Sequence, residues 1–163
     1  MPRTSTAERI RLLRQQGEHE GARRVAVELA SQEPEDAQVQ YEAACVHDYL
    51  GHEAAAVPFY LAAITAGLSG EELRNAYLGL GSTYRALGRY QDALATFDEG
   101  LCNFPGAAEL EVFKAMALYN MGRNKEAVAN LLKVVTETSG DQAVQSLRRA
   151  IALYAEDLDR HWR

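Results

Sequence analysis

Four glycines recur along this chain at nearly constant spacing, and this spacing constrains the fold more than any other feature. They are Gly17, Gly51, Gly88 and Gly122, separated by 34, 37 and 34 residues. An alanine follows each glycine by five residues, and an apolar or aromatic residue follows each alanine by four: Ala22 and Ala26, Ala56 and Tyr60, Ala93 and Phe97, Ala127 and Leu131. A period of this length is typical of stacked repeats, in which each unit buries its apolar face against its neighbours.

The third unit has the clearest version of the repeat. It contains Tyr77, Leu80, Gly81 and Tyr84 at helical spacing, then Ala93 and Phe97, and it closes at Pro105. This pattern resembles the tetratricopeptide repeat, whose signature has an aromatic residue, Leu-Gly, Tyr, a later Ala-x-x-x-Phe and a final Pro. Residues 153–162, with the sequence LYAEDLDRHW, are similar to the end of a bacterial subgroup, tetratricopeptide repeat group five. Members of that subgroup are thought to act as dimers, so the resemblance implies a bacterial protein and a homodimer.

The resemblance implies an all-α fold, a right-handed α-solenoid of about four helix pairs and a C-terminal capping helix. We expect a single array over 1–163, with repeats at about 3–34, 37–68, 74–105 and 108–139 and the capping helix at 141–161. The predicted helices are 5–16, 19–32, 37–50, 53–67, 71–87, 90–103, 107–121, 124–138 and 141–161. Each repeat glycine follows a helix end, where a left-handed residue is favoured. Asp141 is a suitable N-cap for the last helix.

Two glycines lie inside the helix predicted at 71–87. A glycine in a helix interior costs about 1 kcal/mol relative to alanine, so each needs a reason in the packing. Close approach of the helix that contains Ala93 explains Gly81. For Gly79 we expect instead that the missing side chain leaves room at an exposed groove.

In tetratricopeptide repeats the first helix of each pair lines a concave channel, and partners commonly bind there. The resemblance therefore implies a protein or peptide partner in that channel. The partner-binding residues that we expect are the channel-facing residues of the four first helices: Arg11, Arg14, Tyr41, Tyr49, Asn75, Leu78, Ser82, Arg85, Val112, Phe113, Met116 and Tyr119. Some family members grip a peptide terminus with Lys and Asn, but the first three units here contain no Lys. Arg11, Arg14 and Arg85 with Asn75 are the alternative grip on an acidic group.

The first helix of the fourth unit is apolar on two faces. Ala115 and Leu118 belong to its core stripe, whereas the other apolar stripe faces the channel and consists of Val112, Phe113, Met116 and Tyr119. A helix that is apolar over most of its circumference is usually buried on most of it. The channel-facing stripe could be buried in three ways: by a neighbouring helix of the same chain, by a peptide, or by a second copy of the chain.

No pattern for catalysis or metal binding occurs in the sequence, which contains no HExxH, no CxxC and no phosphate-binding loop. We therefore expect a non-enzymatic interaction scaffold with no catalytic residue, cofactor or metal. The alternative is a small-ligand-binding protein or enzyme with a pocket around Tyr41, Cys45, His47, Asp48 and Tyr49. A deep, enclosed polar pocket at those residues would favour this alternative, and an open channel would count against it.

Charge and hydropathy limit the kinds of partner and the cellular location that we expect. Residues 34–101 contain three basic and ten acidic side chains, so we expect no nucleic-acid partner, because such binding depends on Lys and Arg. No apolar run approaches the roughly 18 residues that span a bilayer, and the first residues lack a signal-peptide core. Cys45 and Cys102 form no paired motif, which fits a reducing compartment. These features predict a cytoplasmic protein with no membrane partner.

Overall fold

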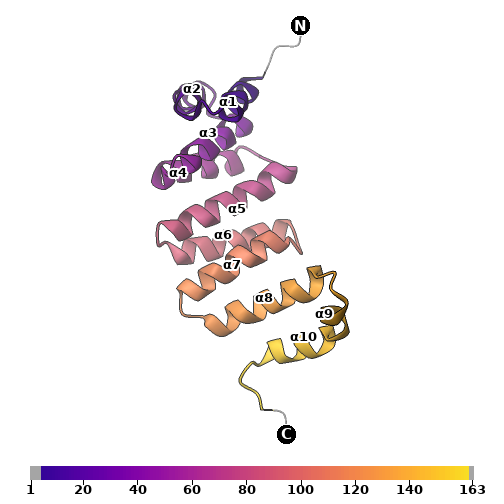
Figure 1. The fold of residues 1–163 in the computed structure, drawn as a ribbon. Coiled ribbons are helices and arrows are strands. Elements are labelled where there is room, and N and C mark those ends of the chain that lie inside the picture. Colours follow the sequence, from indigo (N-terminus) through magenta and orange to yellow (C-terminus); the bar gives the residue numbers. More distant parts are fainter. Residues whose placement is uncertain (1–4, 162–163) are drawn as a thin grey trace. The chain divides into compact units, whose positions relative to one another are not determined.

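The structure is a computed structural model of the chain that describes residues 5–161. Every regular element in this range is an α-helix, and the chain divides into two compact units, Met1–Arg89 and Tyr90–Arg163. The first unit contains α1–α5 and the second contains α6–α10 (Figure 1). Trp162, part of the C-terminal motif, lies outside the described residues.

The helices of the first unit are α1 (Thr6–Gln15), α2 (His19–Gln32), α3 (Ala37–Tyr49), α4 (Glu53–Thr65) and α5 (Gly70–Ala86). Those of the second are α6 (Tyr90–Asn103), α7 (Ala108–Asn120), α8 (Asn124–Thr138), α9 (Gln142–Ser146) and α10 (Arg148–Glu156). In sequence order, α1–α5 pack side by side in the first unit and α6–α8 in the second (Figure 1). In the first unit, α3 also packs against both α1 and α5. This stacking of helix pairs confirms the all-α solenoid predicted from the repeat.

The turns between paired helices form as the glycine pattern predicts. Gly17, Gly51, Gly88 and Gly122 have φ values of 82°, 73°, 73° and 74°, in the left-handed region that residues with a side chain avoid. Side chains cap the starts of α1, α3 and α9. The Asp36 carboxylate accepts hydrogen bonds from the backbone amides of Gln38 and Val39 at 2.9 and 3.0 Å.

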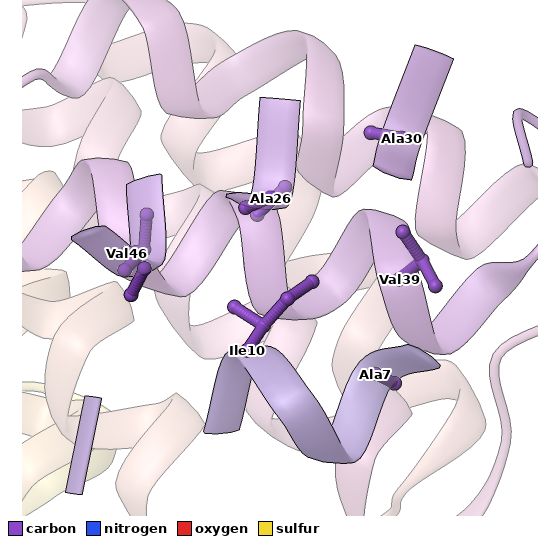
Figure 2. Packing of buried hydrophobic residues seen from close by; sticks show 8 residues of the cluster. Ala7, Ile10, Ala26, Ala30, Val39 and Val46 are labelled. Carbon is purple, nitrogen blue, oxygen red and sulfur yellow. The ribbon is translucent and has the colours of Figure 1, made fainter. Parts of the chain in front are cut away.

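The core of the first unit joins α1, α2 and α3. Ile10 of α1 is fully buried, with Ala26 of α2 and Val39 and Val46 of α3 around it (Figure 2). Because the α2 residues at this contact are alanines, the helix backbones approach closely. Burial of one such isoleucine is worth about 1.5–3 kcal/mol. The contact fixes α1 beside α3. It thereby places Arg11 and Arg14 of α1 against Glu42 of α3.

The second unit has a smaller core. Ala115, Leu118 and Ala127 are buried together, with Leu94 of α6 packed against them. Phe97 of α6 is fully buried, and its ring meets that of Phe113 of α7 at a centroid distance of 6.4 Å. These contacts join α6, α7 and α8.

The single helix predicted at 141–161 is divided in the structure. Asp141 caps the start as expected, and its carboxylate accepts hydrogen bonds from the amides of Ala143 and Val144 at 2.8 and 3.2 Å. The first piece, α9, ends at Ser146, and the Gln145 side-chain amide beside this end donates to the Ser139 carbonyl, just after α8, at 2.6 Å. After Leu147 the chain begins a second helix, α10, which packs along α8.

Candidate functional site

A buried carboxylate lies at the centre of the surface formed by α1, α3 and α5, the first helices of the pairs in the first unit. The Glu42 side chain is 2% exposed, and both of its oxygens accept hydrogen bonds from arginines of α1. Arg11 donates to one oxygen from Nε at 2.7 Å, and Arg14 donates to the other from Nη1. A buried charge is tolerated only when it is paired and hydrogen-bonded, and two guanidinium groups satisfy that condition here.

The ion pairs extend from this carboxylate to α5. Nη2 of Arg11 donates to Glu72 at 2.8 Å, and the second oxygen of Glu72 accepts from the Gln38 amide at 3.3 Å. The hydrogen bond with Glu42 is the largest cause that raises the pKa of Arg11, so the arginine stays charged. One network of side chains therefore connects α1, α3 and α5.

This network forms the wall of a hollow of about 280 Å³. Its lining residues come from all three helices: Arg11, Arg14, Gln15, Tyr41, Glu42, Glu72 and Asn75. Two arginines and two glutamates balance in charge, so the hollow offers hydrogen-bond donors and acceptors without a net charge. The arginines were expected to grip an acidic group, but Glu42 already accepts hydrogen bonds from Arg11 and Arg14.

Next to this hollow, Asp48 joins three helices. Its carboxylate accepts hydrogen bonds from the Tyr60 hydroxyl of α4 at 3.1 Å and from the Thr83 hydroxyl of α5 at 3.0 Å. Burial raises the pKa of Asp48 above its ordinary value, and it raises the pKa of Tyr60 as well. These bonds hold α4 and α5 against the end of α3.

The Tyr60 ring occupies the space that Gly79 leaves. A Cβ atom at Gly79 would lie 2.4 Å from the Tyr60 hydroxyl and 2.6 Å from Cζ of the ring. The expectation of an open groove beside Gly79 was therefore wrong, because an aromatic side chain from the preceding helix fills the site. Gly79 permits the approach that brings the Tyr60 hydroxyl to Asp48.

The five residues of the alternative pocket do not all converge on one pocket. Cys45 shares hydrogen bonds with the hydroxyls of Tyr41 and Tyr60, and burial raises the pKa of this thiol. The His47 imidazole instead bonds the Ala43 carbonyl from Nδ1 at 3.1 Å and packs on Phe59 at a ring distance of 5.0 Å. The Tyr49 ring stacks on His19 of α2 at 4.0 Å. Tyr41, Cys45 and Asp48 are therefore joined through Tyr60, whereas His47 and Tyr49 lie in other surroundings, and of the five only Tyr41 lines the hollow.

In the second unit, the apolar stripe of α7 is divided between core and solvent. Phe113 is half-buried against Phe97, and Val112 is also half-buried. Met116 and Tyr119 are 39% and 66% exposed. The neighbouring helix therefore covers Phe113, one member of the stripe, and leaves the end toward Tyr119 open to solvent.

Four of the predicted site residues line the hollow, namely Arg11, Arg14, Tyr41 and Asn75. Leu78, Ser82 and Arg85 are half-buried on α5, and Tyr49 lies against α2 instead. The list of expected partner-binding residues did not include Glu42 and Glu72, which hold the arginines in place. The available signal was the pair Arg11 and Arg14, which share a helix face and need acidic partners on a neighbouring helix.

The described residues offer no arrangement typical of a metal site or a membrane span. Within residues 5–161, no group of three or more His, Cys, Asp or Glu side chains is arranged to hold a metal ion. Nor does any helix in this part of the chain combine the length and apolar character needed to cross a membrane.

The stacked helix pairs and the open surface of their first helices define an α-solenoid repeat protein. The chain belongs to the tetratricopeptide repeat family, because the family model TPR_5, described as Tetratrico peptide repeat, matches residues 37–158. The family resemblance of the sequence is thereby confirmed. Proteins of this family are generally non-enzymatic scaffolds that bind protein or peptide partners.

Two solved structures show the same fold. A mutant of MamA is 19% identical, with a TM-score of 0.71, and the match covers 82% of this chain and 76% of that one. YrrB, described as a TPR protein with an unusual peptide-binding site, is 21% identical, with a TM-score of 0.69 and coverage of 93% and 76%. A search of curated proteins found no match.

Proposed function

We propose that this chain is a non-enzymatic scaffold that binds a peptide segment of a protein partner on the surface of its first helices. The observation on which this rests is the hollow of about 280 Å³ between α1, α3 and α5, lined by polar groups from all three helices. YrrB, which shares the fold, has a peptide-binding site of its own, and this supports the proposal by analogy.

The chemistry of the hollow indicates what kind of peptide fits. Because Arg11 and Arg14 are balanced by Glu42 and Glu72, an acidic peptide gains no net attraction there. A segment with both donors and acceptors, such as extended backbone with amide or hydroxyl side chains, matches the lining. The amide of Asn75, which is exposed, is placed to bond such a backbone.

The open part of α7 adds an apolar contact in the second unit. Met116 and Tyr119 offer a thioether and an aromatic ring to a partner, and both side-chain types are favoured at interfaces. A partner with an apolar side chain fits this patch. A second copy of the chain is the other candidate occupant, as the similarity to the group-five subgroup implies.

Selection from a random peptide library on the immobilised full chain tests this proposal. Peptides that are enriched are then measured by fluorescence polarisation against the wild type and against Asn75→Ala and Tyr119→Ser. We expect each substitution to weaken binding of the peptides that contact its own unit by about tenfold, the effect of removing an interface hot spot.

Matched controls are exposed apolar residues on second helices. Leu61 of α4 and Val128 of α8 are each 45% exposed. Leu61→Ser and Val128→Ser should leave binding unchanged. Peptide binding that the control variants weaken and the first-helix variants do not would contradict the proposal, as would a library that yields no binder.

The proposal also includes the biological setting. We place the protein in the cytoplasm, with a protein or peptide as partner rather than a nucleic acid or a membrane. That residues 1–163 form a single continuous array remains a prediction. The alternative is that the two compact units behave as separate bodies.

A further inference from the structure

A hollow of about 700 Å³ lies between α1 and α2, and we call it the α1–α2 groove. Its apolar lining consists of Leu12, Leu13, Val25 and Leu29. Leu12 is 43% exposed, and the other three are half-buried. Arg9 and Arg24 also line the groove, and both are exposed. Exposed apolar surface gathered in one place marks an interaction site.

The second helix pair, α3 and α4, has an equivalent of this surface. A shift of 34 residues, the distance from Gly17 to Gly51, carries each position of the groove onto that pair. The equivalents of Arg9, Leu12, Leu13 and Leu29 are Ala43, Val46, His47 and Ala63. Ala43, Val46 and Ala63 are fully buried, and His47 is 5% exposed. In the second pair, the surface that corresponds to the groove is therefore covered.

A helix with a stripe of alanines covers the second pair. Ala22, Ala26 and Ala30 of α2 lie four residues apart, and they belong to the same core cluster as Ala43 and Val46 of α3 (Figure 2). Residues four apart lie on one side of a helix, and the small size of alanine lets α2 approach α3 closely. Among α1–α5, no equivalent helix covers the α1–α2 groove. The surface thus takes a helix with small residues at every fourth position.

The groove differs from the covered surface in charge. Arg9 and Arg24 replace uncharged residues of the second pair. Glu20, one turn before Arg24, pairs with Arg23 at 2.9 Å, and Arg23 is the main cause that lowers the pKa of Glu20, with a smaller contribution from Arg24. Glu28, one turn after Arg24, accepts a hydrogen bond from within α2. No acidic side chain of the described residues lines the groove, so its arginines favour an acidic partner.

We propose that the α1–α2 groove binds an amphipathic helix of a partner protein, with small residues at every fourth position and acidic residues beside them. The small residues contact Leu12, Leu13 and Leu29 as the alanines of α2 contact α3, and the acidic residues lie near Arg9 and Arg24. A second copy of the chain does not supply α2 as this helix, because the alanines of α2 are buried in its own core. The groove shares no lining residue with the 280 Å³ hollow, so this binding surface is additional to that of the proposed function.

A synthetic helix is the probe that tests the groove. It has the sequence of α2, residues 19–32, with Arg23→Glu and with Arg24→Lys joined to Glu28 by a side-chain lactam. The lactam is needed because a free peptide of this length is only marginally helical, and the two changes make the probe acidic. Fluorescence polarisation measures its binding to the full chain. We expect saturable binding that weakens at high salt, which screens exposed charge pairs.

Two variants of the chain should each weaken binding of the probe by about tenfold or more. Leu12→Asp places a charge on the apolar lining, and Arg24→Glu reverses a positive charge without an apolar change. Val27→Asp is the matched control, because Val27 is 41% exposed on α2 but lies outside the groove. It should bind as the wild type does. A probe with Ala26→Leu should also bind at least about tenfold more weakly, because a large side chain keeps the two helices apart.

The outcomes separate this groove from the other surfaces. Leu12→Asp should still bind library-selected peptides as the wild type does, because Leu12 does not line the 280 Å³ hollow. A probe that does not bind overturns the proposal, and so does equal binding by Leu12→Asp or by the probe with Ala26→Leu. Sedimentation velocity tests the other occupant. If the wild type self-associates and Leu12→Asp does not, a second copy occupies the groove and the proposal is wrong.

Discussion

Replacement of Gly79 by alanine tests how the packing around Asp48 works. Helix propensity alone makes the substitution favourable by about 1 kcal/mol, because glycine is the poorer residue inside a helix. The new Cβ would, however, lie 2.4 Å from the Tyr60 hydroxyl, and Tyr60 is only 3% exposed. Its ring has no free space to enter.

The magnitude follows from these two opposed effects. Overpacking of a buried side chain costs about 1–3 kcal/mol, and loss of the Tyr60–Asp48 hydrogen bond adds about 1 kcal/mol. After the gain in helix propensity, we expect Gly79→Ala to lower the free energy of unfolding by about 1–3 kcal/mol. Urea unfolding followed by circular dichroism, at a concentration where the chain is monomeric, measures it.

Two controls separate the clash from other effects. Gly21 lies inside α2, and a Cβ there would meet only Glu18 Cβ at 3.8 Å, an ordinary contact. Gly21→Ala should therefore stabilise the chain by up to about 1 kcal/mol. In a Tyr60→Leu background, where the ring is absent, Gly79→Ala should become neutral or stabilising. If Gly79→Ala instead stabilises the wild type as Gly21→Ala does, the reasoning from Tyr60 is refuted.

Two further predictions concern buried ionisable groups. Glu42→Gln removes the charge that pairs with two half-exposed arginines, and we expect the free energy of unfolding to fall by about 1–3 kcal/mol. The loss is smaller than for a fully buried pair because water screens the arginines. The control is Glu20→Gln, which removes the carboxylate of an exposed ion pair and should have almost no effect in the same urea titration. Burial lowers the pKa of His47 in the folded chain below its ordinary 6.5. The unfolded chain therefore takes up a proton at this ring first, and stability is lost as the pH falls from 6.5 through the lower pKa of the folded state. His47→Gln should flatten the decrease in thermal midpoint between neutral and mildly acidic buffer, whereas the exposed His161→Gln should not; an unchanged decrease would show that another group is responsible.

The repeat period predicted most of the fold because each helix pair repeats one packing unit. The glycines at 17, 51, 88 and 122 marked the turns, since only a left-handed residue ends these helices so tightly. The break at Leu147 was not predicted. It lies next to the hydrogen bond from the Gln145 side chain to the Ser139 carbonyl, and periodicity says nothing about such a contact.

Less of the candidate site than of the fold could be predicted from the sequence. Helical spacing placed Arg11, Arg14, Tyr41 and Asn75 on one surface, and they line one hollow. It did not show that Glu42 pairs with both arginines, because that pairing depends on how closely α1 approaches α3. Nor did it show that Tyr60 fills the space at Gly79, which requires the position of α4 relative to α5.

Nuclear magnetic resonance with a library-selected peptide tests the central claim most directly. Amide shifts of the isotope-labelled chain are followed as the peptide is added. We expect the largest shift changes on the first helices, either on α1, α3 and α5 around the hollow or on α7 around Tyr119. Changes confined to the second helices α2, α4, α6 and α8 would contradict it.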